Sequence, residues 1–283
     1  MAKLPPYVGV GGRTWNVGYN LICALVYLFL IAPILVIIPL SFNAEPYFTF
    51  TPAMLSLDLH GFSLRWYQDI LANEQWMRAI RNSFVIGFFA TLLATTLGTI
   101  AALGLSNSRM PYRTAVMAVL LSPMIVPVII TAAGMYFFYS SIGLSQTFLG
   151  IILAHAALGT PFVVITVTAT LSGFDRSLMR ASASMGATPT GTFFKVVVPL
   201  ITPGVISGAL FAFITSFDEV VAVLFLSGPD QRTVPRQMWA GIREQISPTI
   251  LAVATLLILV SVLLLATLEL LRRRNERMRG IKP

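Results

Sequence analysis

The sequence predicts an all-α membrane protein with six transmembrane helices. Of its 283 residues, 56% are hydrophobic and only 11% are charged, whereas a soluble domain carries about 25% charged residues. Long runs without any charged residue also recur along the chain. A helix that crosses about 30 Å of hydrocarbon needs roughly 20 apolar residues. The chain is therefore expected to fold in a lipid bilayer.

Five charge-free runs supply the six predicted spans. Four runs fit one helix each, whereas Thr114–Phe174 is long enough for two helices that turn near Ser140–Gln146, where Ser, Gly and Gln collect. The predicted chain has three parts: a short N-terminal lead (1–16), a membrane domain (17–272) and a basic tail (273–283). The predicted spans cover residues 19–41, 82–106, 114–139, 147–171, 197–226 and 247–270.

Lys and Arg set the predicted orientation, because cytoplasmic loops of membrane proteins are enriched in them. The lead, residues 107–113, residues 172–195 and residues 272–283 together hold 13 of the 19 basic residues, and the opposite side holds six. Both termini are therefore predicted to be cytoplasmic. The net charge of +8 follows from this asymmetry and is no evidence for nucleic-acid binding.

Few residues suggest a catalytic, metal-binding or cofactor site within the chain. The single cysteine, Cys23, excludes an intrachain disulfide and a cysteine-based metal site. No glycine-rich phosphate loop, HExxH or GxSxG pattern occurs. We therefore predict no catalytic residue, no metal site and no cofactor. An intramembrane enzyme would have to use His155 with Asp218, and no motif supports that pair.

Prolines interrupt the predicted spans 114–139 and 147–171. Pro123 and Pro127 lie in the first, and Pro161 lies in the second. A proline frees backbone groups that must be satisfied within protein or along a cavity. Broken helices of this kind surround many transport pathways, and simple kinks that improve packing are the alternative.

Residues 174–195 form a polar segment whose pattern predicts a helical hairpin. Asp175 can cap a first helix, and Gly186 suits the residue after its end. Thr188 and Pro189 suit the cap and first residue of a second helix. A small apolar surface between basic residues suits docking to a soluble partner; packing on the protein's own bundle is the alternative. The predicted surface consists of Leu178, Ala181, Ser182 and Met185, with Phe193 and Phe194 behind it.

The same segment resembles a cytoplasmic motif of the permease subunits of binding-protein-dependent ABC importers. That motif reads EAA, three residues, Gly, nine residues and I-x-L-P. Here Arg180-Ala181-Ser182 is followed by three residues, Gly186, nine residues and Val196-Val197-Val198-Pro199. The spacing, the Gly and the Pro match. Arg180 departs from the motif because it stands where the family has Glu, and Ser182 replaces the second Ala.

The resemblance covers essentially the whole chain and implies a type I ABC importer permease in a bacterial inner membrane. In that family the hairpin sits in a cleft of an ATPase subunit and transmits ATP-driven closure to the membrane helices. The implied partners are a second homologous permease, two ATPase subunits that bind ATP and Mg²⁺, and a periplasmic solute-binding protein. The implied coupling residues are Arg180, Ala181, Ser182, Met185, Gly186, Phe193, Phe194 and Pro199.

A narrower resemblance concerns the solute. Residues 216–221, 227–229, 233–235 and 246–248 resemble the second permease subunit of spermidine/putrescine importers, which implies a polyamine. Importers of other small solutes share parts of this pattern. An amino-acid derivative such as GABA, an opine, a metal or an oxyanion therefore stays open, as does a secondary transporter.

Asp218 and Glu219 lie within the predicted span 197–226. A carboxylate at this depth costs a few kcal/mol, so it faces the bundle interior and marks a function by default. Adjacent helical residues point about 100° apart, so one carboxylate is expected to face the pathway and the other a neighbouring helix. A cationic solute would neutralise them; structural hydrogen bonding is the alternative. The predicted substrate-pathway residues are Asp218, Glu219, Phe217 and His155. For His155 the alternative is a helix–helix hydrogen bond, which a lone His within a span makes more often.

Overall fold

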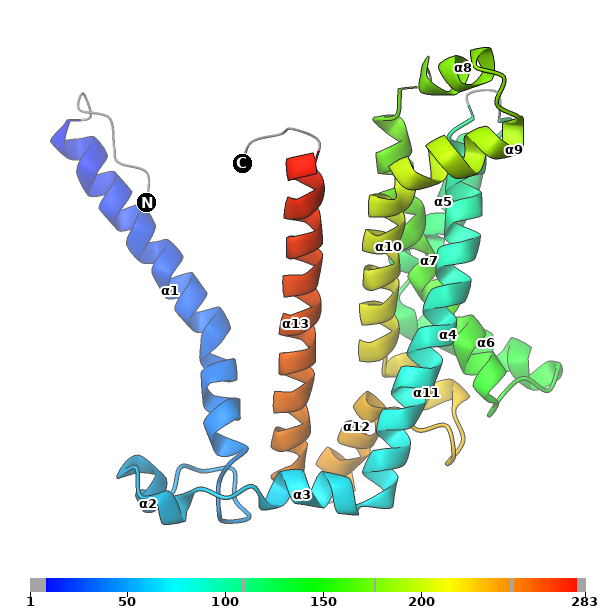
Figure 1. Ribbon diagram of the computed structural model, residues 1–283. Coiled ribbons are helices and arrows are strands. Elements are labelled where there is room, and N and C mark those ends of the chain that lie inside the picture. The colour runs from blue at the N-terminus through cyan, green and yellow to red at the C-terminus, as the bar shows by residue number, and fades with distance from the viewer. Residues whose placement is uncertain (1–8, 108–109, 176, 245–246, 279–283) are drawn as a thin grey trace. The chain divides into compact units, whose positions relative to one another are not determined.

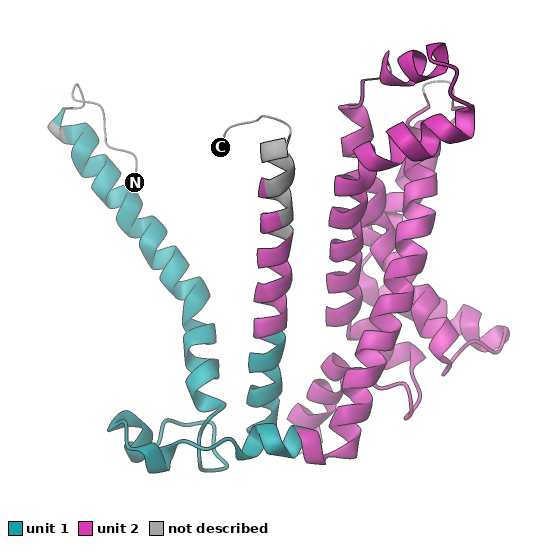
Figure 2. Cartoon of the chain, viewed as in Figure 1, with its two compact units in different colours: residues 1–70, 245–257 teal, residues 71–244, 258–283 magenta. Residues whose placement is uncertain are grey.

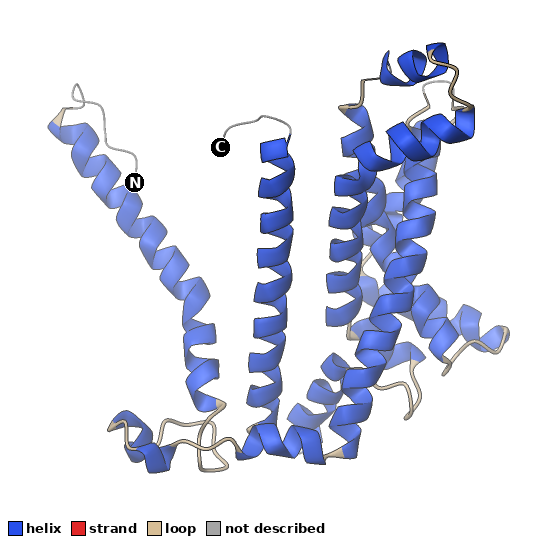
Figure 3. Ribbon diagram, in the orientation of Figure 1, coloured by secondary structure: helices blue, strands red, loops and turns tan. Residues whose placement is uncertain are grey.

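The computed structural model describes residues 9–107, 110–175, 177–244 and 247–278. Its regular structure is helical (Figure 3), and the described residues contain no β-strand, only one isolated antiparallel bridge between Asn43 and Phe62. The predicted all-α class is confirmed. Residues 1–8 of the predicted lead and 279–283 of the predicted tail lie outside the described residues.

The number of candidate spans agrees with the prediction. Five helices of the described chain are long and apolar enough to cross a membrane, and a sixth span arises if one bent pair of helices is counted. The first helix begins at Val10 and the second span at Glu74, several residues before the predicted starts. Single helices supply three of the spans, α1 (Val10–Leu40), α4 (Glu74–Leu105) and α7 (Phe148–Ser172), and the other two include α10 (Val198–Asp218) and α13 (Thr249–Met278).

The chain forms two compact units, residues 1–70 with 245–257 and residues 71–244 with 258–283 (Figure 2). In the first unit, hydrogen bonds to the fully buried Asn43 order the segment after α1. Its amide donates to the carbonyl oxygens of Tyr47 (3.0 Å) and Thr49 (2.9 Å), and its own carbonyl oxygen accepts from the Trp66 indole (2.8 Å). The short helices here are α2 (Pro52–Leu55), η1 (Leu59–Gly61) and the start of α3 (Arg65–Ala72).

In the second unit α4, α7 and α10 pack side by side (Figure 1). Small residues form much of their contact: Ala90, Ala94 and Ala102 of α4 are buried in one cluster with Val163 of α7 and Ala212 of α10. Short residues let helix backbones approach closely in a membrane. The remaining helices of this unit are α5 (Arg113–Ile125), α6 (Val128–Ser141), α8 (Ser177–Ser184), α9 (Pro189–Thr192), the π-helical turn η2 (Phe193–Val197), α11 (Val221–Leu226) and α12 (Val234–Glu244).

The predicted span 114–139 is not one straight helix. Helices α5 and α6 meet at an angle of 102°, and the break falls at Val126 and Pro127. The residue before a proline is pushed out of the helical region, and Val126 has ψ 132°. Proline also lacks the N–H that would continue the helix. The sequence marked the proline correctly, but the bend is much larger than a packing kink.

The prediction of one continuous helix over residues 197–226 is wrong. Helix α10 ends at Asp218, Glu219 is extended with ψ 119°, and α11 restarts at Val221. The acidic pair therefore lies at a helix break and not inside a helix. A carboxylate can bond backbone N–H groups of the next helix, which stabilises such a break.

Helix α10 faces α7 through a small residue at every fourth position: Gly204, Gly208, Ala212 and Ser216, all buried. A Cβ on Gly159 of α7 would lie 3.0 Å from the Ala212 Cβ. Positions four apart share one face of a helix, so the series forms a continuous stripe. The α7–α10 interface is consequently a contact between backbones and short side chains.

We expect Gly208→Ala to destabilise this interface. The added Cβ would lie 2.5 Å from the Thr166 Oγ1 and 2.8 Å from the Val163 Cα, which is backbone. Overpacking of this kind costs about 1–3 kcal/mol, so the purified protein should melt at a lower temperature. The control is Gly104→Ala, whose Cβ would meet no atom within 4 Å. Equal melting temperatures for the two variants would contradict the close approach.

Candidate functional site

The helix break gives the two carboxylates different environments. The Glu219 Oε1 accepts the backbone N–H of Ala222 at 2.9 Å, in the first turn of α11. Asp218 is exposed and has no ion-pair or hydrogen-bond partner within the described part of the chain. Glu219 therefore stabilises the break, while Asp218 presents a free carboxylate. Which of them faces a solute stays a prediction.

Phe217, the residue before this pair, packs with two other phenylalanine rings. The Phe217 ring lies 5.2 Å from Phe84 of α4, edge to face, and 5.4 Å from Phe213, stacked. The prediction included only Phe217. Phe213 lies one helical turn before it, which the sequence could have indicated, whereas Phe84 is brought there by the packing of α4 on α10.

His155 is buried in α7, with 1% of its surface exposed. Its Nδ1 lies 2.8 Å from the Ser216 Oγ on α10. The described residues thus pair His155 with Ser216 and not with Asp218, which gives the enzyme alternative no support. Its placement favours the helix–helix hydrogen bond that was the alternative to a pathway role.

The predicted hairpin geometry is confirmed. The Asp175 Oδ1 accepts the backbone N–H of Ser177 at 2.8 Å at the start of α8, and hydrogen bonds from Ser177 hold the pKa of the Asp175 carboxyl below its ordinary value. Gly186 follows α8 with φ +82°. Thr188 caps α9 through its hydroxyl, and Pro189 is the first helical residue. Each residue does what its local chemistry predicts.

Side chains of the hairpin divide into inward and outward sets. The Ser182 hydroxyl lies 2.9 Å from the Thr192 hydroxyl, which joins α8 to α9. Phe193 packs against the buried cluster of α4, α7 and α10. Met185 and Phe194 are 87% and 66% exposed. The sequence analysis placed Phe194 behind the docking surface, whereas the structure places it on the exposed surface. Two further coupling candidates, Arg180 and Ala181, are exposed as well.

A π-helical turn connects the hairpin to α10. The backbone N–H of Val198 donates to the carbonyl oxygen of Phe193, five residues earlier. Pro199 follows directly; it has no N–H, and its ring would crowd the carbonyl of Lys195 in a regular α-helix. Widened turns of this type are frequent at functional sites. The presence of Pro199 is thus explained by the π-helical turn as well as by its place in the motif.

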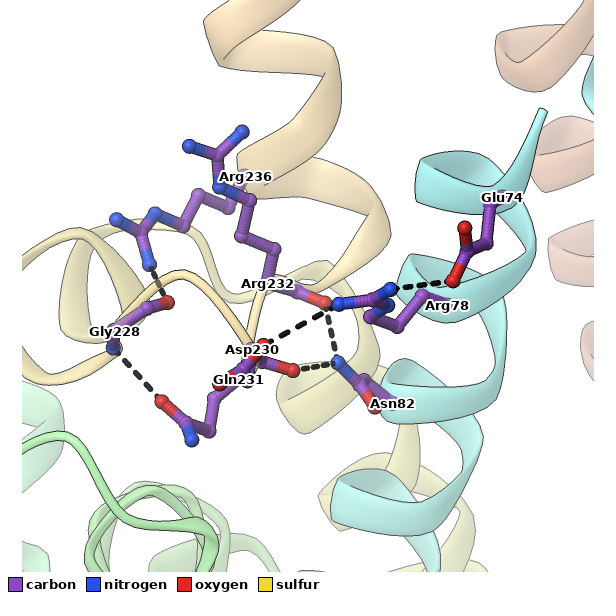
Figure 4. Close-up of polar contacts among 8 residues, drawn as sticks. All are labelled: Glu74, Arg78, Asn82, Gly228, Asp230, Gln231, Arg232 and Arg236. Carbon is purple, nitrogen blue, oxygen red and sulfur yellow. Dashed lines mark hydrogen bonds and ion pairs between the residues drawn. The ribbon is translucent and has the colours of Figure 1, made fainter.

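A polar cluster that the sequence did not predict lies at the end of the second unit opposite the hairpin (Figure 1), and Figure 4 shows its contacts. The Asn82 side chain, 1% exposed, donates to the carbonyl oxygens of Asp230 (2.7 Å) and Arg232 (3.0 Å). Arg78 forms ion pairs with Glu74 (2.6 Å) and Asp230 (3.3 Å). A cavity of about 280 Å³ lies beside these residues. The cluster fastens the loop after α11 to the first turns of α4.

The described residues are helical, with five or six candidate membrane spans, two interruptions and a carboxylate without a partner at one break; these are features of membrane transport subunits. Residues 94–277 match the family model described as binding-protein-dependent transport system inner membrane component. The chain belongs to this family and is an inner-membrane permease subunit.

Individual relatives agree with the family. The spermidine/putrescine transport system permease protein PotC of Haemophilus influenzae is 31% identical over 257 residues, 91% of this chain and 97% of the relative. The putrescine transport system permease protein PotI of Escherichia coli (strain K12) is 32% identical over 244 residues, 84% of each chain. A bacterial ABC transporter structure involved in alginate import matches 94% of this chain and 99% of that chain, with a TM-score of 0.71 and 15% identity. At that identity the structure supports the fold alone.

Proposed function

We propose that this permease forms, with a second homologous permease, the passage of an ATP-driven importer for a polyamine such as spermidine or putrescine. Two relatives support this solute, because the permeases at 31% and 32% identity belong to spermidine/putrescine and putrescine transport systems. The observation that carries the proposal in this chain is the free Asp218 carboxylate, which directly follows Phe217 of the Phe84, Phe213 and Phe217 ring cluster.

The chemistry of that site suits a flexible cation with an apolar backbone. A carboxylate attracts an ammonium group strongly where water is scarce, and aromatic faces attract cations by about 0.5–2 kcal/mol. The rings of Phe84, Phe213 and Phe217 also offer apolar surface to the methylene groups between two ammonium groups. An anionic solute would meet repulsion from Asp218, so the oxyanion alternative is disfavoured.

The 174–195 hairpin is proposed as the contact with the ATPase subunits. Its exposed Met185 and Phe194 give an apolar surface, and Arg180 adds a positive charge to it. ATP and Mg²⁺ would bind to the ATPase subunits and not to this chain, and a periplasmic binding protein would deliver the solute. Because Arg180 replaces Glu, we propose that the facing ATPase group is acidic or a hydrogen-bond acceptor.

Solute-stimulated ATP hydrolysis by the purified whole complex tests the solute class. Putrescine, spermidine, GABA, an opine and an oxyanion would each be added with the binding protein present. We expect stimulation by a polyamine at concentrations that leave the other solutes inactive. Stimulation only by a neutral, zwitterionic or anionic solute would overturn the polyamine proposal and keep the permease assignment.

A further inference from the structure

Several threonine hydroxyls of α7 bond within their own helix, whereas the Ser216 hydroxyl of α10 does not. The hydroxyls of Thr160, Thr166 and Thr170 on α7 donate to carbonyl oxygens four residues earlier, at 2.7–2.9 Å. The Ser216 hydroxyl instead bonds across the interface to His155. Both residues are buried, with 4% and 1% of their surfaces exposed. This pair is thus a directional connection between α7 and α10.

The pair occupies the last position of the small-residue series. Glycine and alanine at positions 204, 208 and 212 set the distance between the two helices by close contact, but none of them makes a directional side-chain bond. Ser216 comes four residues later, and His155 lies four residues before Gly159 on α7. Two residues beyond Ser216 the helix ends at Asp218. Among the described residues, the hydrogen bond that joins α7 to α10 therefore stands directly before the acidic break.

Packing alone does not explain an imidazole at this position. The Nε2 of His155 is buried and has no hydrogen-bond partner within the described residues, and an unpartnered buried polar atom is unfavourable. Leucine or methionine would fill the same volume without that penalty. What the imidazole adds is the bond from its Nδ1 to Ser216.

We propose that His155 is a positioning residue for solute passage: its hydrogen bond to Ser216 sets the rotation of the last turn of α10 and thereby directs Asp218. This inference rests on the proposed role of Asp218 in binding a cationic solute. A helix whose last turn can rotate presents a carboxylate over a range of directions, which weakens an interaction that depends on geometry.

Kinetics of the whole complex in proteoliposomes test the role in transport. We expect Ser216→Ala and His155→Leu each to raise the half-saturating solute concentration roughly three- to fifteen-fold, the range of one interhelical hydrogen bond. The double variant should be no worse than the poorer single variant. His155→Asn, which keeps a polar atom near the Nδ1 position, should recover most of the loss. Additive losses, or no recovery by His155→Asn, would overturn the proposal.

A labelling experiment tests the positioning itself, without reference to the solute. Asp218→Cys is made in a Cys23→Ala background, which removes the only native cysteine of the chain, and its labelling by a charged thiol reagent is timed. Ser216→Ala should change that rate at least three-fold. Thr160→Val is the matched control, because its hydroxyl bonds only to Ala156 of its own helix.

The outcomes separate this inference from the proposed function. Equal labelling rates in Ser216→Ala and Thr160→Val would overturn the positioning role, whatever the solute. Normal uptake by Asp218→Asn would instead overturn the role of that carboxylate. A labelling change without any shift in half-saturation would also count against His155 as a positioning residue for transport.

Discussion

Replacing Asp218 by Asn should lower polyamine uptake at least ten-fold while the complex still assembles. Asn has the same shape but no charge, so only the electrostatic attraction for an ammonium group is lost. One charge pair in a partly desolvated site is worth more than about 1.4 kcal/mol, which is a factor of ten. Asp218 bonds to no other described residue, so the fold should tolerate the change. Uptake would be measured with labelled spermidine or putrescine in proteoliposomes.

Two further acidic residues provide matched controls. Glu219→Gln keeps an oxygen that can accept the Ala222 N–H, so we expect it to lose less polyamine uptake than Asp218→Asn. Asp230→Asn removes an exposed carboxylate that pairs with Arg78, and exposed pairs contribute little. Uptake by that variant should stay within about two-fold of the native rate. Normal uptake by Asp218→Asn would contradict the cation-binding role.

Gly186→Asp should uncouple ATP hydrolysis from transport. Gly186 has φ +82° and open space around it, so a side chain there would meet the docked ATPase subunit before any residue of this chain. A carboxylate at the turn of an apolar contact is unfavourable because it loses water on docking. We expect transport to fall ten-fold or more, with solute-independent ATP hydrolysis retained. Both rates would be measured on the reconstituted complex.

Gly186→Asn separates charge from backbone strain. Asn and Asp both adopt the left-handed region more readily than other residues, so strain should be similar in the two variants. Coupling in Gly186→Asn should therefore remain close to native. Unchanged solute-stimulated hydrolysis in Gly186→Asp would contradict the docking role of the hairpin.

The hairpin could be predicted residue by residue because its determinants are local. Asp175, Gly186 and the Thr188–Pro189 pair act on neighbours within three or four positions. Hydropathy likewise gives the number of spans, because the length of an apolar run limits where a helix can cross. These features need no knowledge of which helices pack together.

The break between α10 and α11 could not be read from hydropathy, because apolar residues continue on both sides of the acidic pair. Its position depends on Glu219 bonding to Ala222 after the chain has turned. The grouping of Phe84 with Phe217 and the pairing of His155 with Ser216 depend on tertiary packing. The residue at the Pro127 bend could be predicted from the sequence, but its angle of 102° could not.

The small-residue face of α10 has a mechanical consequence. Long side chains act as soft spacers, because a change of rotamer can absorb a displacement of several tenths of an ångström. Glycine and alanine have no such freedom, so α7 and α10 resist being displaced relative to each other along Gly204, Gly208 and Ala212. A push applied at the π-helical turn would move both helices together and reach Asp218 with little loss. The permease is therefore most flexible at its helix breaks, and the helical segment between two breaks moves as a rigid body.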